Sequence, residues 1–64
     1  MTRVRRGGYL FVAWKGDHSP YHVHVYRDGK LVMKWDLESD RLMVGHAPTT
    51  VLALIRLLRK EGLL

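Results

Sequence analysis

Residues 21–36 read YHVHVYRDGKLVMKWD, and this stretch decides the fold of the 64-residue chain. Two runs of alternating character, 21–26 and 30–36, lie on either side of Arg27-Asp28-Gly29. Alternation with a period of two is typical of strands with one buried face, and a short glycine-containing loop between two such runs predicts a β-hairpin. We therefore expect two antiparallel strands here.

The two faces of this hairpin separate best when the loop has three residues. A loop of Arg27-Asp28-Gly29, with Gly29 in the left-handed conformation, pairs Tyr26 with Lys30. One face then carries the apolar residues Tyr21, Val23, Val25, Leu31, Met33 and Trp35, and the other carries His22, His24, Tyr26, Lys30, Val32 and Lys34. Because a slip of one residue would destroy this separation, we predict the three-residue loop.

Further strands are predicted on both sides of the hairpin. Residues 9–14, YLFVAW, are almost wholly apolar, which is typical of a strand that is covered on both faces or lies centrally in a sheet. The acidic stretch 36–40 is turn-like, and residues 41–44 are compatible with a short fourth strand. Both tryptophans, Trp14 and Trp35, are expected in the core.

One helix is predicted near the C-terminus. Pro48 suits its first turn, where the missing N–H costs nothing, and Gly62 suits its end. Its apolar stripe consists of Val51, Leu54, Ile55 and Leu58, with Leu52 and Leu57 on either side. This arc is wider than packing on one sheet requires, so we expect the helix also to mediate a homo-oligomer. The predicted fold class is α+β, an antiparallel sheet of three to four strands with one C-terminal helix packed on one face.

The composition excludes several classes of protein. The chain has 11 Lys plus Arg against 6 Asp plus Glu, a formal charge of +5 and no cysteine. It therefore has no thiol nucleophile, zinc-thiolate site or disulfide, while its charge points to a polyanionic partner. We expect a single domain over 1–64, with 1–7 as a flexible basic arm. No apolar run is long enough for a signal sequence or a membrane span, which favours a cytoplasmic protein without membrane contact.

Three of the four histidines lie in the stretch Asp17-His18-Ser19-Pro20-Tyr21-His22-Val23-His24. His22 and His24 are two residues apart on a predicted strand, so they point to the same side, the polar face. His18 lies just before that strand. The plain alternative is that these histidines are polar surface residues and that Lys30 and Lys34 protect a sheet edge from aggregation.

One interpretation of the histidines is an RNA-binding face that also cleaves RNA. His22 and His24 would act as general acid and base, because histidine titrates near neutral pH, with His18 assisting and Asp17 orienting a histidine. RNA supplies its own 2′-OH nucleophile, so this cleavage needs no cofactor. Phosphate contacts would come from Lys30, Lys34, Arg3, Arg5 and Arg6, and Tyr26 would stack on a base.

The second interpretation is a non-enzymatic module that binds a metal or a protein partner. His18, His22 and His24 would then be ligands of a divalent metal such as zinc or nickel. Imidazole nitrogens from alternate residues of a strand can converge on one ion, and Asp17 could act as a further ligand or orient a histidine.

The sequence resembles a widespread bacterial family, the domain of unknown function 4160. The likeness is carried by Gly8-Tyr9, by residues 17–24, by the hairpin glycine Gly29, and by Gly45-His46-Ala47-Pro48 before a leucine-rich helix. The family motif is D-H-x-P-P-H-x-H, and Tyr21 stands here in place of the second proline. The resemblance covers nearly the whole chain, although many relatives continue further beyond the helix.

Members of that family are often encoded beside a second small protein, in pairs that look like toxin–antitoxin modules. The resemblance therefore implies a toxin–antitoxin-type protein whose partners are RNA and a cognate toxin or antitoxin. It does not imply which of the two members this chain would be.

Overall fold

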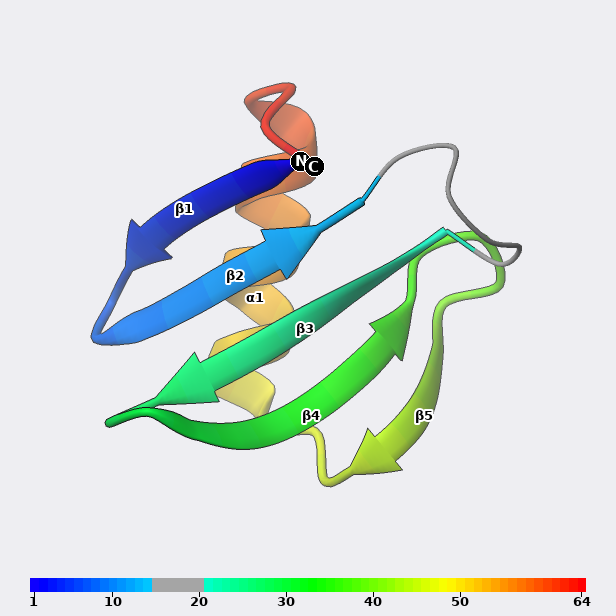
Figure 1. The fold of residues 1–64 in the computed structure, drawn as a ribbon. Coiled ribbons are helices and arrows are strands. Elements are labelled where there is room, and N and C mark those ends of the chain that lie inside the picture. The colour runs from blue at the N-terminus through cyan, green and yellow to red at the C-terminus, as the bar shows by residue number, and fades with distance from the viewer. Residues whose placement is uncertain (15–20) are drawn as a thin grey trace.

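The computed structural model describes residues 1–14 and 21–64. These residues form a five-stranded antiparallel sheet, with the strands in sequence order, followed by one helix (Figure 1). The elements are β1 (Thr2–Arg6), β2 (Tyr9–Ala13), β3 (His22–Arg27), β4 (Lys30–Asp36), β5 (Arg41–Gly45) and α1 (Thr49–Lys60). The α+β class is confirmed, whereas the predicted count of three to four strands is wrong, because the N-terminal segment adds β1.

β1 takes the place of the flexible basic arm that we predicted for residues 1–7. It pairs with β2 through a two-residue turn, in which Gly7 and Gly8 have φ angles of 61° and 82°. Positive φ at both central positions is the type I′ geometry, which matches the twist of a hairpin and which glycine adopts without steric cost. Val4 also packs against the core. The arm prediction is therefore wrong for Thr2–Arg6.

The turn of the β3–β4 hairpin has two residues rather than the predicted three. Arg27 pairs with Lys30, and Asp28 and Gly29 between them have φ angles of 52° and 75°. This is again the type I′ geometry, for which Asp-Gly is a preferred pair. A two-residue turn alone would mix polar and apolar residues on both faces, which is why the alternation favoured the longer loop.

A β-bulge at Val32 restores the separation of the two faces. Tyr26 pairs with Leu31 but Val25 pairs with Met33, so Val32 is an extra residue in β4. One inserted residue changes the side to which the rest of the strand points. Met33 consequently lies in the core as predicted, whereas Leu31 lies beside Tyr26 on the opposite face and is 43% exposed.

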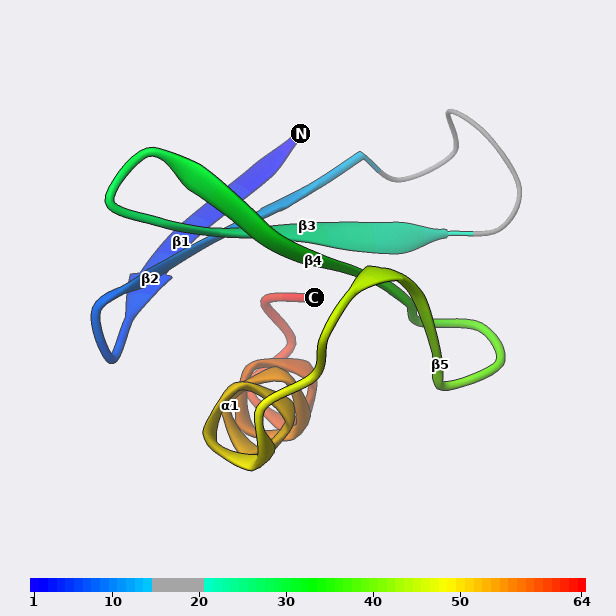
Figure 2. The ribbon, with the colours of Figure 1, turned by 90° about the horizontal axis from the view of Figure 1, so that it is seen from below.

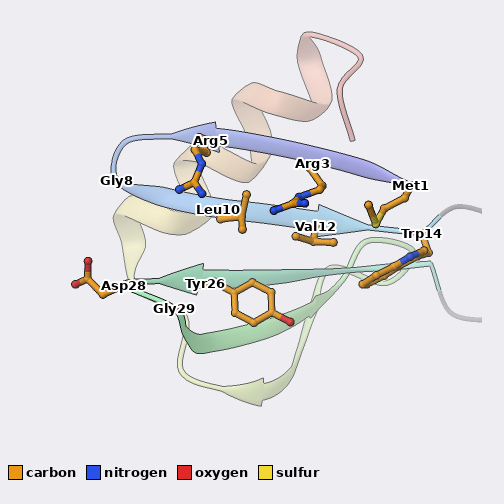
Figure 3. Close-up of a pocket in the computed structure, with 10 residues that line it drawn as sticks. All are labelled: Met1, Arg3, Arg5, Gly8, Leu10, Val12, Trp14, Tyr26, Asp28 and Gly29. Atoms are coloured by element: carbon orange, nitrogen blue, oxygen red, sulfur yellow. The ribbon is translucent and has the colours of Figure 1, made fainter.

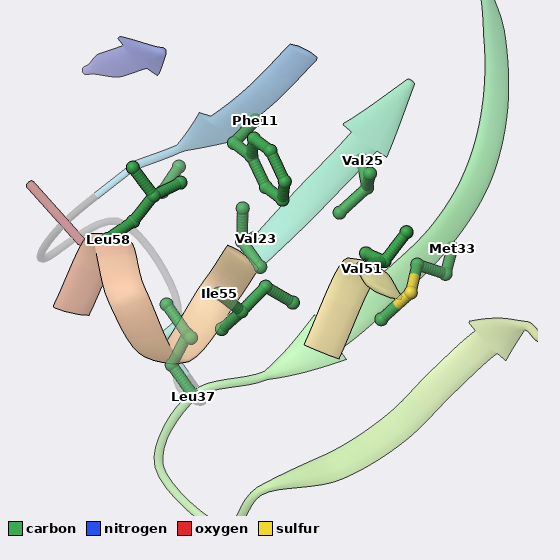
Figure 4. Packing of buried hydrophobic residues seen from close by; sticks show 9 residues of the cluster. Phe11, Val23, Val25, Met33, Leu37, Val51, Ile55 and Leu58 are labelled. Atoms are coloured by element: carbon green, nitrogen blue, oxygen red, sulfur yellow. The ribbon is translucent and has the colours of Figure 1, made fainter. Parts of the chain in front are cut away.

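α1 covers one face of the sheet (Figure 2). It contributes Val51, Ile55 and Leu58, which are at most 2% exposed and pack against buried side chains of the sheet (Figure 4). The other members of this core are Phe11, Ala13, Val23, Val25, Met33 and Leu37. Burial of apolar surface stabilises a fold by about 25 cal/mol per Å². The layer between sheet and helix is therefore the main source of stability, and no described element covers the opposite face of the sheet.

Gly45 lies at the end of β5, where the chain leaves the sheet. Its φ angle is 86°, and a Cβ atom at this position would lie 2.2 Å from the carbonyl oxygen of Val32 and 3.1 Å from the Cα atom of Met33. The backbone at the end of β5 thus passes directly over the bulge in β4. Glycine permits both the conformation and the close approach.

We predict that Gly45→Ala lowers the free energy of unfolding more than Gly29→Ala does. Both positions have a positive φ, which costs of order 1–3 kcal/mol for a residue with a side chain. A Cβ at Gly29, however, would have nothing within 4 Å. The difference between the two variants in urea denaturation therefore measures the contact with Val32, and equal destabilisation would contradict this account of the β4–β5 contact.

Candidate functional site

The sheet face opposite α1, here called the open face, carries basic, aromatic and apolar side chains in rows. Cross-strand partners point to the same side of a sheet, so the register assigns the rows. One row is Arg5, Leu10, Tyr26 and Leu31, and the next is Arg3, Val12, His24, Lys34 and Val44. In a third row His22 pairs with Asp36.

Four aromatic rings lie together on the open face. The ring centroid of His24 lies 5.2 Å from that of Trp14, 5.0 Å from that of His22 and 6.3 Å from that of Tyr26. The contacts with Trp14 and Tyr26 have interplanar angles of 66° and 76°, an edge-to-face arrangement that aromatic pairs favour. His24 is therefore the centre of an aromatic cluster.

The surroundings of His24 favour its neutral form. Its Nε2 atom is buried and has no hydrogen-bond partner among the described residues. Burial lowers the pKa of His24, and repulsion from His22 and Lys34 lowers it further. At neutral pH the His24 ring is thus an uncharged aromatic surface between the tryptophan and the tyrosine.

A groove of about 500 Å³ opens on this face between β1 and β3 (Figure 3). Leu10 and Val12 of β2 form its floor, while Arg3 and Arg5 of β1 line one side and Tyr26 of β3 lines the other. The two ends are lined by Met1 and Trp14, and by Gly8, Asp28 and Gly29. The groove therefore combines an apolar floor, an aromatic wall and a cationic wall.

Most of the described residues that we predicted for an RNA site lie on the open face, and Lys30 does not. Those on the open face are His22, His24, Tyr26, Lys34, Arg3 and Arg5. Lys30 pairs with Arg27, whose guanidinium donates to the Tyr9 hydroxyl at 3.1 Å and lies 5.1 Å from the centre of its ring, on the helix side. The two-residue turn thus moves Lys30 away from the histidines, and Leu31 takes its place.

Arg6 also points to the helix side. Its two terminal nitrogens each donate to one carboxylate oxygen of Glu61 at 3.0 Å. This hydrogen-bonded ion pair raises the pKa of Arg6 and lowers that of Glu61. Arg6 therefore connects β1 to the end of α1 and does not join Arg3 and Arg5 on the open face.

Asp17 and His18 lie outside the described residues, so the roles assigned to them stay predictions. Within 1–14 and 21–64, no group of three or more His, Asp or Glu side chains is placed to hold a metal ion. The zinc or nickel site of His18, His22 and His24 therefore also stays a prediction.

Leu10, Val12 and Trp14 belong to the groove but were not among the predicted site residues. We expected Trp14 in the core, and this is wrong, because its side chain is 38% exposed at one end of the groove. Trp35, in contrast, packs against the core as expected. The sequence feature that indicates the groove is the run 9–14. Its side chains are apolar on both sides of the strand, although only one side faces α1.

α1 buries part of the apolar arc that we expected to face another chain. Leu52, which we expected beside the stripe, packs partly against the core, as does Leu54 of the stripe, whereas Leu57 is 43% exposed and Leu63, beyond the helix, is 40% exposed. The homo-oligomer through this helix stays a prediction that depends on the exposed leucines. Among the described residues, no helix has the length and apolar character that crossing a membrane requires.

No family model, curated protein or solved structure matches the chain. The resemblance to the domain of unknown function 4160 therefore depends on the motif residues quoted above.

We predict that His24 makes the stability of the fold depend on pH. Histidine in an unfolded chain has a pKa of about 6.5, whereas burial lowers the pKa of His24 in the folded state. Between these two values the unfolded state binds more protons, so the free energy of unfolding rises with pH; the contribution of His24 is present above about pH 6.5 and is lost as the pH falls from there through the lower pKa of the folded state. Thermal melting across this range measures the slope.

His24→Phe keeps an aromatic ring and removes this titration, so the variant is expected to show a smaller slope of stability against pH. Titration of the His24 ring proton by NMR gives its pKa directly. A His24 pKa at or above about 6.5, or a slope that the substitution leaves unchanged, would contradict the assignment.

Proposed function

We propose that the open face binds single-stranded RNA. The observation that carries this proposal is the placement of Arg3, Arg5 and Lys34 around a partly exposed aromatic cluster on one face of the sheet. Proteins bind single strands through positive grooves that follow the phosphates and through aromatic side chains on which bases stack. A sheet with exposed aromatic residues is a recurrent platform for this purpose.

The cations flank the aromatic cluster on two sides. Arg3 in β1 and Lys34 in β4 belong to one cross-strand row, with Val12 and His24 between them. Three interstrand spacings separate their backbones, which is about 14 Å. A strand of RNA that crosses the sheet can thus place phosphates on both cations while its bases lie over the aromatic cluster around His24.

The burial of His24 favours binding over cleavage. A general base must come within about 3 Å of the proton that it removes, and the Nε2 atom of His24 is buried. RNA cleavage by His22 and His24 stays a prediction, and incubation of RNA with the wild type and with the variant His22→Ala, His24→Ala tests it. Loss of cleavage in a folded double variant is the result expected if the pair is catalytic.

We also propose that the protein belongs to a toxin–antitoxin-type pair and has a cognate small protein as its second partner. This part rests on the family resemblance and is compatible with the positive charge of the chain. Growth of cells that express the chain alone, and then together with the product of the adjacent gene, distinguishes a toxin from an antitoxin.

We predict that the double variant Arg3→Gln, Arg5→Gln binds single-stranded RNA more weakly and with a smaller salt dependence. Each phosphate contact contributes about 0.7 to the slope of log K against log salt for single strands. Two lost contacts therefore reduce the slope by about 1.4. Fluorescence anisotropy with a labelled oligoribonucleotide at several salt concentrations measures both quantities.

The control variant Arg56→Gln, Lys60→Gln removes the same charge from exposed positions of α1, on the other side of the molecule. It is expected to bind RNA almost as the wild type does. An equal loss of affinity in the two double variants would mean that net charge alone attracts the RNA, and the proposal for the open face would fail.

A further inference from the structure

We infer that the groove between β1 and β3 holds one nucleobase over Leu10 and the outward face of Tyr26, with the adjoining phosphate on Arg3 and Arg5. The inference rests on the proposed function, since the base would belong to the bound strand. It goes further by assigning the base and its phosphate to particular walls of one groove on the open face.

The floor and the β3 wall of the groove suit a flat aromatic ligand. Leu10 and the nearly buried Val12, which is 7% exposed, form the floor, and the ring of Tyr26 lies on the β3 side with its face turned away from the sheet (Figure 3). Arg5, Leu10 and Tyr26 follow one another in a cross-strand row, so the backbones of the two walls are about 10 Å apart. This distance leaves space for a ring system beside Tyr26.

The size of the groove fits a nucleotide rather than a lone ring. Its volume of about 500 Å³ lies within the range of known small-molecule sites, about 300–1,000 Å³. Tyr26 supplies a surface on which any of the bases can stack, because every base has a π-face. The ribose and a phosphate would then lie toward β1.

The charged side chains that line the groove determine which part of a nucleotide would lie at each side of it. Arg3 and Arg5 line the β1 side, and arginine binds phosphate oxygens with two parallel hydrogen bonds. Asp28 lies at the end formed by the β3–β4 turn, where its carboxylate would repel a phosphate. The phosphate is therefore expected beside the arginines, and the base over Leu10 and the outward face of the Tyr26 ring.

Trp14 provides a spectroscopic reporter for this groove. Its side chain lines one end of the groove and is 38% exposed. The other tryptophan, Trp35, packs against the core and does not line the groove. A ligand that enters the groove is expected to change the fluorescence of Trp14, and the variant Trp14→Phe is expected to lose that change.

The test titrates the full chain with adenosine monophosphate, with uridine monophosphate and with a single-stranded hexaribonucleotide, and follows tryptophan fluorescence. Tyr26→Leu is expected to weaken binding of the hexanucleotide roughly 5- to 150-fold, the loss that corresponds to one base–aromatic stack. Tyr26→Phe keeps the ring and is expected to retain the affinity of the wild type. Circular dichroism melting confirms that each variant is folded.

The outcomes separate the inference from the proposed function. Binding of the hexanucleotide without a change in Trp14 fluorescence, or with equal affinity for the Tyr26→Leu variant, would overturn the inference and leave RNA binding intact. Free nucleotides that bind the groove as tightly as the hexanucleotide would support the inference and contradict a function in RNA binding. If none of the three ligands binds, both fail.

Discussion

A β-bulge that offsets a tight turn decides which residues of β4 lie in the core and which lie on the open face. The two-residue turn Asp28-Gly29 would, by itself, direct Met33 away from the helix, and the extra residue Val32 directs it back into the core. The carbonyl group of Val32 lies where Gly45 passes over β4. The bulge, the β4–β5 contact and the path of the chain toward α1 are therefore parts of one arrangement, and a change in any one of them disturbs the side-chain pattern of both faces.

Much of the apolar content of this small chain lies in β2, which has apolar side chains on both faces of the sheet. Phe11 and Ala13 are buried under the helix, whereas Leu10 and Val12 form the floor of the groove on the other side. A strand that is covered on both faces has apolar residues at successive positions, and in β2 the second set of apolar residues lines the groove. Part of the hydrophobicity that we assigned to a helix interface thus belongs to the open face.

Sequence alternation predicts the core of this protein better than its turns. The side-chain period of two predicts the buried residues of β3 and of β4 beyond the bulge, where Val25 and Met33 lie in the core as predicted, but it places Leu31 on the wrong face. A three-residue loop and a two-residue turn followed by a bulge both preserve that alternation, so the pattern does not distinguish them. The type of turn decides whether Lys30 or Leu31 lies on the same face as the histidines. Only the structure shows that this residue is Leu31.

The sequence pattern also did not predict β1 as a strand. Three of its five residues are arginines, a composition typical of a solvated arm, and the apolar signal is the single residue Val4. The strand forms because Gly7-Gly8 makes a favourable hairpin turn and because β2 offers an unpaired edge. Once the strand forms, alternation places Arg3 and Arg5 over the groove.

The distribution of charge over the open face matches the chemistry of a single strand of nucleic acid. The basic residues Arg3, Arg5 and Lys34 lie at the sides of the face, while His24 in the middle stays uncharged at neutral pH because burial lowers its pKa. A compact inorganic polyanion would be bound best by cations that converge on one point. A strand of RNA instead carries its charge along the backbone and presents neutral rings beside it, so cations around an uncharged aromatic centre form the more complementary surface.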